Sequence, residues 1–196
     1  MKKKFEIVIC GAGMVGMIFA LHMSKYKINV CLIDQKEKES FKNQKDQRTT
    51  AISQGSSRIL KDINIWEELR SKVQPILQIL VSEGCKDKNM KFDHEKINEG
   101  PLGFIIDNKF FKKKLFDEII KSKFITYYDK TEIKEINSSS ENNRLLITNK
   151  GSIEYKVLVA ADGRFSKTRF HANIKYFYHD YNQNAFVFNI SHEQKH

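Results

Sequence analysis

The sequence is poor in the residues that stabilise small secreted domains and in those that interrupt a chain with turns. It holds 3 cysteines, 2 prolines and 9 glycines in 196 residues. An odd, low number of cysteines argues against a disulfide framework and indicates a reducing compartment. So little glycine and proline, together with 40% hydrophobic residues, excludes collagen, flexible linkers and global disorder. The sequence therefore predicts a globular domain with a full-sized core.

Long hydrophobic runs are also absent. No apolar run reaches the roughly 18 residues that a membrane-spanning helix needs. The lysines at 2–4 and the mostly apolar stretch to Leu21 resemble a signal peptide only superficially, because Glu6 and three glycines interrupt the stretch. No small-x-small cleavage site follows. We therefore expect a soluble domain of the cytoplasm.

Negative charge is the scarcer sign, with 24 acidic residues against 34 basic ones and a net charge of +10. Only six of the basic residues are Arg, and the other 28 are Lys scattered along the chain. A nucleic-acid surface usually combines Arg and aromatic residues on one face. We therefore interpret the excess of lysine as a bias of composition and expect no nucleic-acid partner. The six histidines are dispersed, and Cys85 and His94 lack paired ligand spacing, so we assign no metal site.

A strand, a glycine turn, a helix and a second strand follow one another at the start of the chain. Phe5–Cys10 is short, apolar and rich in Ile and Val, which predicts a buried strand. Apolar residues recur at helical spacing between Met14 and Lys25, and 29–33 has the pattern of a second buried strand. Together these elements have the size of one βαβ unit.

Further along, the pattern predicts more helices and strands. A polar loop is expected over 35–50, a helix near Ser53–Asp62 and a short helix anchored by Trp66. A further helix has Phe111, Leu115 and Ile119 on one face, with Asp107 or Asn108 as its N-cap. The remaining strands are expected at 74–82, 102–107, 124–128, 157–160 and 185–190, with an antiparallel meander over 131–155 whose turns lie at 139–143 and 149–151.

The glycine turn has the spacing of a dinucleotide-binding motif. Gly11 permits a tight turn, Gly13 lets the backbone approach a pyrophosphate, and Gly16 allows close packing of helix on strand. Asp34 lies 34 − 16 = 18 residues after the last glycine, where a carboxylate accepts hydrogen bonds from a ribose. The motif alone does not distinguish FAD from NAD. The residues assigned to the phosphates, at the positive end of the helix, are Gly11, Gly13, Met14, Val15 and Gly16.

Two further segments distinguish the cofactors. Segment 46–53 reads Asp-Gln-Arg-Thr-Thr-Ala-Ile-Ser, and 157–169 is an apolar strand followed by Ala-Asp-Gly, x-x-Ser and x-x-Arg. The second resembles the Asp-Gly motif of flavin-dependent aromatic hydroxylases. The first resembles the Asp-x-Arg-x-x-Ala-Leu segment of their ubiquinone-biosynthesis branch. Segments 102–108 and 181–185 also look like that branch, so the resemblance covers nearly the whole chain in the family's order.

This resemblance implies an α/β fold. It implies a Rossmann-like FAD-binding domain over 1–172, with a parallel sheet, helices and a β-meander. An excursion at 72–107 would contribute to a mixed or antiparallel substrate sheet, and 173–196 would begin a truncated substrate domain. Family members are much longer, and a Gly-Asp motif in their second half has no counterpart here. The sequence therefore resembles an N-terminal half, which would be inactive alone and would need a complementing C-terminal half.

The resemblance also implies roles for individual residues. The motif glycines would hold the FAD pyrophosphate and Asp34 the adenosine ribose. Arg48 would lie near the phosphates and the ribityl chain, a task that suits a fixed cation with five donors. Asp162 would approach the FAD and serve NAD(P)H use. Two alternatives stay open at this point, a solvated loop cation for Arg48 and a helix N-cap for Asp162.

The sequence departs from the family's pattern at two positions. Asp34 stands where FAD-binding relatives often have Glu, which is chemically close. Lys109 stands where the branch often has Arg, so we assign no cofactor contact to Lys109.

The implied activity is that of an FAD-dependent monooxygenase. Such an enzyme would use NAD(P)H and O2 to hydroxylate the aromatic ring of a ubiquinone precursor, a prenylated phenol. The apolar tail of this substrate would bring the protein to the inner membrane surface, assisted by the net positive charge. Because the flavin supplies the chemistry, no catalytic residue is assigned. The sequence leaves two other functions open, an NAD(P)-dependent dehydrogenase and a non-catalytic dinucleotide-binding remnant.

Overall fold

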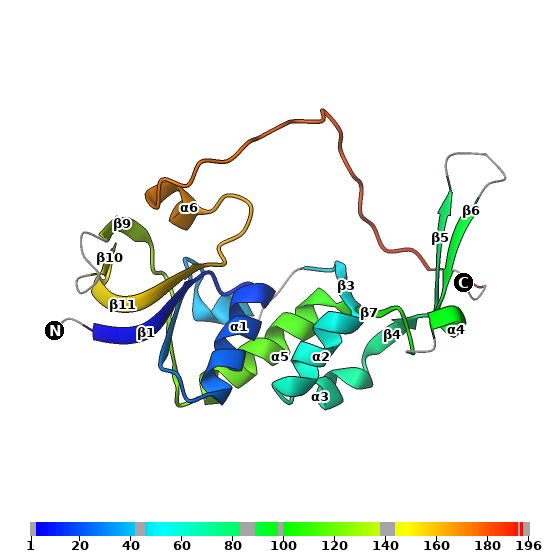
Figure 1. Ribbon diagram of the computed structural model, residues 1–196, viewed down its shortest axis with the longest axis horizontal. Helices are drawn as coiled ribbons and strands as arrows, with labels where there is room; N and C mark the ends of the chain where they lie inside the picture. The colour runs from blue at the N-terminus through cyan, green and yellow to red at the C-terminus, as the bar shows by residue number, and fades with distance from the viewer. Residues whose placement is uncertain are drawn as a thin grey trace. The chain divides into compact units, whose positions relative to one another are not determined.

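The computed structural model describes residues 3–41, 46–82, 89–97, 100–137, 144–191 and 193. The chain divides into two units (Figure 1). Unit 1 comprises Met1–Lys45 and Lys112–Phe188, and unit 2 comprises Asp46–Phe111 and Asn189–His196. The boundary at 111/112 lies within helix α5 (Asn108–Lys121). The division at 172/173 that the sequence suggests stays a prediction.

Unit 1 is built on a six-stranded sheet with the order β8-β2-β1-β11-β10-β9. Its strands are β1 (Lys3–Cys10), β2 (Val30–Ile33), β8 (Ile125–Tyr128), β9 (Ile133–Asn137), β10 (Leu145–Thr148) and β11 (Gly151–Ala160). Strands β8, β2, β1 and β11 run parallel, whereas β10 pairs antiparallel with both β9 and β11. The predicted parallel sheet with a β-meander is confirmed.

Strand β11 joins the two kinds of pairing. Its first residues pair antiparallel with β10, and 153–160 pair parallel with 3–10 of β1. The sequence predicted a meander ending at Tyr155 and a separate strand over 157–160; in the structure one ten-residue strand covers both. The predicted turn at 149–151 is present, with Gly151 at φ +114°, and the one at 139–143 lies outside the described residues.

Alternating side chains of β1 and β2 form two cores. Val8 and Cys10 of β1 and Cys31 and Ile33 of β2 belong to one buried cluster with residues of the meander strands. The intervening residues, such as Ile9, are fully buried as well and point to the other face of the sheet. Helix α1 (Met14–Lys25) packs against β1 and β2. Burial on both faces explains why these strands are continuous apolar runs.

Two helical elements and an aromatic group complete the core of unit 1. The 3₁₀ helix η1 (Lys38–Phe41) places Phe41 in a parallel stack on Phe116, with ring centroids 4.2 Å apart. Tyr127 of β8 meets the Phe116 ring edge-on at 5.1 Å. Helix α6 (Lys167–His171) follows β11 and contacts β9. The expectation of a polar loop over 35–50 was therefore wrong at 38–41, because the apolar Phe41 anchors a helical turn there.

Unit 2 contains an antiparallel sheet with the order β3-β7-β4. Helix α2 contacts both β7 and α3, and Trp66 packs edge-on against Phe104 at 4.7 Å. The α2 N-cap is Ser53, whose Oγ accepts a hydrogen bond from Ser56 N (3.1 Å). The elements are β3 (Thr49–Ser53), α2 (Gln54–Asp62), α3 (Trp66–Arg70), β4 (Val73–Ile76), β5 (Gln78–Ser82), β6 (Asn89–Asp93), α4 (His94–Ile97) and β7 (Gly103–Asp107).

Several predicted boundaries in unit 2 were wrong. The predicted strand 74–82 is two strands, because β4 pairs with β7 whereas β5 pairs with β6 in a separate two-stranded sheet. Strand β3 occupies residues expected to be a loop and the opening of a helix. The sequence pattern also missed β6 and α4. For α5, Asp107 is confirmed as the capping residue, since its Oδ1 accepts a hydrogen bond from Phe110 N (2.7 Å).

The strand predicted at 185–190 was also wrong. Described residues 174–191 form neither helix nor strand, and Figure 1 shows them as a plain trace. A strand requires backbone hydrogen bonds to a neighbour, and none of the described strands pairs with this segment. Its apolar side chains are exposed, among them Phe177 at 90% and Phe186 at 88%.

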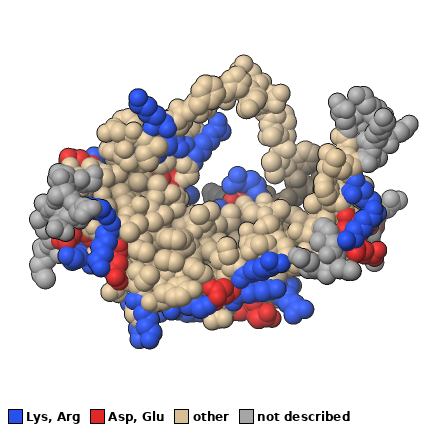
Figure 2. Space-filling model, viewed as in Figure 1, with Lys and Arg blue, Asp and Glu red and all other residues tan. Residues whose placement is uncertain are grey.

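The surface carries charges of both signs, and the helices are too short or too polar to span a membrane in the part of the chain that is described. Figure 2 shows Lys and Arg side chains spread over the face in view, with Asp and Glu among them. None of the helices in the described part of the chain is both long and apolar enough to cross a membrane.

Candidate cofactor-binding site

The carboxyl ends of three parallel strands meet at one edge of the unit 1 sheet. Cys10 at the end of β1 is in register with Ile33 of β2 and with Ala160 of β11. Gly11 N donates to Ile33 O (2.8 Å), and Ala161 N donates to Cys10 O (2.8 Å). The strand order reverses between β1 and β11, and ligands of doubly wound sheets bind at such a reversal.

Two glycines of the turn are required by the backbone itself. Gly11 has φ +105°, a conformation that side-chain-bearing residues rarely adopt. A Cβ at Gly11 would lie 2.5 Å from Ala161 O, and a Cβ at Gly16 would overlap Gly11 O. Gly11 therefore lets the end of β1 lie against the loop that follows β11, and Gly16 lets α1 lie against the backbone of Gly11.

Gly13 differs from both, because a Cβ at Gly13 would meet no protein atom within 4 Å. Gly13 is the N-cap of α1 and contributes no side-chain hydrogen bond to the first turn. No acidic residue occupies that turn, and Val15 is 74% exposed there. The backbone N–H groups at Met14 and Val15 belong to the positive end of a 12-residue helix. This end of α1 thus has the open space and the polarity for an anion.

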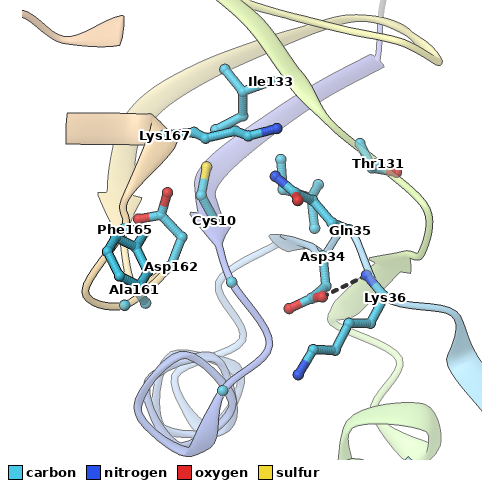
Figure 3. A pocket seen from close by; sticks show the side chains of 14 residues that line it. Cys10, Asp34, Gln35, Lys36, Thr131, Ile133, Ala161, Asp162, Phe165 and Lys167 are labelled. Atoms are coloured by element: carbon cyan, nitrogen blue, oxygen red, sulfur yellow. Dashed lines mark hydrogen bonds between the residues drawn. The ribbon is translucent and has the colours of Figure 1, made fainter. Parts of the chain in front are cut away.

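Asp34 is held beside the glycine turn by two backbone groups. Its Oδ2 accepts a hydrogen bond from Ala12 N (2.6 Å), and its Oδ1 accepts one from Lys36 N (2.8 Å), the dashed line of Figure 3. These bonds fix the carboxylate at the end of β2, as the spacing from Gly16 predicted. An oriented carboxylate in this place can accept hydrogen bonds from ribose hydroxyls.

Asp162 is bonded to the first turn of α6. Its carboxylate accepts hydrogen bonds from Ser166 Oγ, from Thr168 N (2.9 Å) and from Thr168 Oγ1 (2.9 Å). Burial acts to raise the pKa of Asp162, but these hydrogen bonds outweigh it and the pKa is lowered. The N-cap itself is Ser166, whose Oγ accepts from Arg169 N (2.9 Å). Asp162 therefore supports the capped turn that follows Gly163.

These segments surround a cavity of about 490 Å³, within the size range of small-molecule sites. Its wall combines apolar side chains with two carboxylates and two lysines (Figure 3). The described lining residues are Cys10, Gly11, Gly13, Ile33, Asp34, Gln35, Lys36, Thr131, Ile133, Ala161, Asp162, Gly163, Phe165 and Lys167.

A family comparison identifies this arrangement. The model of a family described as an FAD binding domain matches residues 4–195. The chain belongs to this family.

Two of the curated relatives are named as hydroxylases. The ubiquinone hydroxylase UbiM of Neisseria meningitidis is 25% identical over 193 residues, which cover 95% of this chain and 42% of the relative. The 3-demethoxyubiquinol 3-hydroxylase of Escherichia coli is 24% identical over 191 residues, covering 96% of this chain and 49% of the relative. The chain thus spans less than half the length of these two relatives.

Solved structures show the same fold. PqsL of Pseudomonas aeruginosa, described as a probable FAD-dependent monooxygenase, matches 91% of this chain and 48% of its own with a TM-score of 0.76 and 15% identity. The p-nitrophenol 4-monooxygenase PnpA of Pseudomonas putida matches 88% of this chain and 44% of its own with a TM-score of 0.74 and 17% identity. The predicted Rossmann-like α/β fold is confirmed.

The FAD-binding domain fits its family's cofactor at the diphosphate and ribose. The space at Gly13 is one that any larger residue would fill, and it lies at the positive end of α1. Asp34 supplies an acceptor next to it. All the predicted site residues of unit 1 lie at this edge, and Gly11, Gly13, Asp34 and Asp162 line the cavity itself.

The remaining predicted residue of the FAD-binding domain, Arg48, belongs to unit 2. Its Nε and Nη2 donate to Oδ1 and Oδ2 of Asp46 at 2.8 and 3.0 Å, a bidentate pair on an exposed side chain. Asp46 also accepts a hydrogen bond from Asn108 Nδ2 (3.3 Å). The contact of Arg48 with the cofactor stays a prediction.

Cys10 is part of the cavity wall but is not a nucleophile. Burial, the largest influence, raises the pKa of its thiol to about 12, so the thiol stays protonated at neutral pH. Burial raises the pKa of Cys31 too. Both behave as the small hydrophobic residues that their positions inside strands predicted.

The sequence pattern missed several lining residues. Lys36 stands two residues after Asp34, the acid at the end of β2. This position is the one feature of the sequence that could have indicated that Lys36 lines the cavity. Thr131 and Lys167 follow β8 and β11, so only the folded sheet brings them to the end of β1. No local spacing connects these segments.

Proposed function

We propose that unit 1 binds FAD in the cavity at the ends of β1, β2 and β11. The diphosphate would lie on the turn Gly11–Gly16, on the N–H groups of Met14 and Val15, and the adenosine ribose would bind Asp34. The observation that carries this proposal is the open space at Gly13, at the positive end of α1 and beside the Asp34 carboxylate. An NAD-type ligand would use the same turn, so the family match supports FAD over NAD.

We propose two supporting roles toward the same cofactor. Asp162 would approach FAD through the turn that its carboxylate holds in place, and it would serve NAD(P)H use. Arg48 would exchange part of its pairing with Asp46 for the phosphates and ribityl chain, since its guanidinium has five donors. Cys10, Ile33 and Ile133 give the cavity an apolar wall against which the bound ligand would pack.

The longer protein to which this fold corresponds would be a monooxygenase. Bound FAD supplies electron transfer from NAD(P)H and activation of O2, which the amino-acid side chains cannot provide. We propose an aromatic ring of a ubiquinone precursor as its substrate, a prenylated phenol, because two curated relatives are named ubiquinone hydroxylases. This chain's own residues would bind and orient the nucleotide part of FAD. Complementation by a C-terminal half and peripheral contact with the inner membrane are part of the same proposal.

Titration with FAD tests the proposal. Added FAD should lose fluorescence on binding to the purified protein, and the complex should be yellow with an absorbance near 450 nm, roughly as for flavoproteins in general. NADH added in excess should displace little of it. A colourless protein that binds NADH alone would overturn the FAD assignment and favour a dehydrogenase.

A further inference from the structure

Two lysines supply the positive charge of the cavity wall, Lys36 and Lys167. In the view of Figure 3, the Lys36 side chain extends on the α1 side of Asp34, whereas Lys167 extends beside Ile133. Because the diphosphate is proposed to lie at the start of α1, only Lys36 is on the side of the phosphates. The two ammonium groups therefore lie at different parts of the cavity wall.

The backbone of Lys36 is anchored while its ammonium group is available. Lys36 N donates to Asp34 Oδ1 (2.8 Å), and Lys36 O accepts from Lys130 N (3.2 Å). Among the described residues no carboxylate forms an ion pair with Lys36. By contrast, the ammonium of Lys130 pairs with Glu37 at 2.5 Å, and that of Lys167 lies 3.9 Å from Glu132.

The site also needs a cation for charge balance. A dinucleotide diphosphate carries two negative charges, and Asp34 adds a third next to the turn. The N-terminal end of α1 contributes the equivalent of only about half a positive charge. No basic side chain lies in the first turn of α1, whose sequence opens Met-Val-Gly-Met. A lysine on the neighbouring loop would offset the excess.

We propose that the ammonium group of Lys36 binds the diphosphate of the dinucleotide held at the start of α1. This inference rests on the proposed function and deepens it by naming a contact outside the glycine motif. Lys36 makes the site prefer nucleotides with phosphates over the bare nucleoside. It also makes binding dependent on ionic strength, because exposed charge pairs are screened by salt.

Calorimetric titration of FAD, ADP and adenosine into matched variants tests this contact. Lys36→Met removes the charge, and Lys36→Arg keeps it. Lys38→Met is the control, because it removes the same charge two residues further along, at the start of η1, and Lys38 is not among the cavity-lining residues. We expect Lys36→Met to weaken FAD and ADP by roughly fivefold at low salt, as for a partly exposed ion pair. Adenosine should change less than about twofold, since it carries no phosphate.

The salt dependence provides a second readout. The loss in Lys36→Met should shrink as NaCl is added, and Lys36→Arg and Lys38→Met should bind all three ligands like the wild type. Equal weakening of ADP and adenosine, or unchanged ADP binding in Lys36→Met, would overturn the Lys36 contact and leave FAD binding intact. A wild-type protein that binds neither FAD nor ADP would instead contradict the proposed function, and this contact with it.

Discussion

Single residues at the cavity have distinct tasks even where they share a motif. Gly11 and Gly16 are required for the chain to fold on itself, because a Cβ at either position would run into backbone atoms. Gly13 has no such packing constraint, so we expect its lack of a side chain to matter for ligand binding and not for folding. Folding and binding can therefore be separated by mutation within six residues.

Substitution of Gly13 is the cleanest test of the binding turn. We expect Gly13→Val to fold normally and to lower FAD affinity at least about a hundredfold, because the new side chain occupies the space proposed for the phosphates. Fluorescence titration measures the affinity, and thermal unfolding checks the fold. Gly55→Val is the matched control, since Gly55 lies in α2 of unit 2 and a Cβ there meets only Ser53 Oγ at 3.9 Å. Equal FAD affinity in wild type and Gly13→Val would count against the site.

The hydrogen bonds of Asp162 make a pH-dependent contribution to stability. Its pKa in the folded protein lies below its ordinary value of about 4. The stabilisation is therefore fully present above about pH 4 and is lost as the pH falls through the lower folded-state pKa. Asp162→Ala should unfold with roughly 1–2 kcal/mol less free energy than wild type at pH 7, because charged acceptors form the stronger hydrogen bonds.

Urea denaturation at pH 7, 5 and 3.5 measures this difference. The gap between wild type and Asp162→Ala should stay level from pH 7 to 5 and narrow toward pH 3.5. The control is Asp180→Ala, which removes an exposed carboxylate from the segment after α6 and should cost little at any pH. A gap for Asp162→Ala that does not change with pH would show that its carboxylate bonds do not stabilise the fold.

Sequence spacing predicts site residues only where they lie on one local element. The glycines and Asp34 belong to a single βαβ unit, so their relation can be read from the sequence. The sequence left open that Asp162 is a helix N-cap; in the structure Ser166 is the N-cap of α6, and Asp162 accepts hydrogen bonds from Ser166 and Thr168. Lys36 and Lys167 face the same cavity from different segments, and that relation exists only in the folded sheet.

At the scale of elements, the sequence predicted the strands that are buried on both faces of the sheet. It failed for segments whose conformation depends on whether a neighbouring strand pairs with them. The predicted strand Phe5–Cys10 and helix Met14–Lys25 match β1 and α1, because their apolar patterns are strong. Strand β3 has a mostly exposed, Thr- and Ser-containing sequence, and its conformation depends on pairing with β7. The segment 185–190 is the opposite case. Its sequence is apolar enough for a strand, but none of the described strands pairs with it, and it does not adopt strand structure.

The segment 174–190 should be the first part of the chain to be cut by a protease. It has no helix or strand, and its aromatic residues are exposed by 60% or more, such as Tyr181 at 75% and Phe188 at 75%. Backbone without buried contacts opens at little free-energy cost. Brief chymotrypsin digestion followed by mass spectrometry should show initial cuts between Tyr176 and Phe188. Initial cuts within β1, α1 or α5 would contradict this description of the fold.

The whole molecule combines the cavity proposed to bind a nucleotide, in unit 1, with an exposed apolar hairpin in unit 2. In unit 1 the six-stranded sheet has buried cores and places the cavity at its carboxyl edge. In unit 2 the β5–β6 hairpin exposes Ile79, Val81, Met90 and Phe92, which share one face by their register. Exposed apolar surface of this kind marks an interaction site or promotes aggregation. The chain spans less than half the length of the curated relatives UbiM and 3-demethoxyubiquinol 3-hydroxylase.

For this reason we expect the 196-residue chain alone to bind FAD weakly and to hydroxylate nothing. Productive hydroxylation needs the reactive ring enclosed with substrate and shielded from water. The lining residues of the described cavity are proposed to bind the nucleotide end of FAD, and no enclosed pocket for a second ligand follows from them. Any NAD(P)H oxidation by the purified chain should therefore yield hydrogen peroxide. Parallel measurement of NAD(P)H consumption, peroxide and hydroxylated phenol tests this. Product formed from a prenylated phenol in step with NAD(P)H consumption would show that this chain completes the active site by itself.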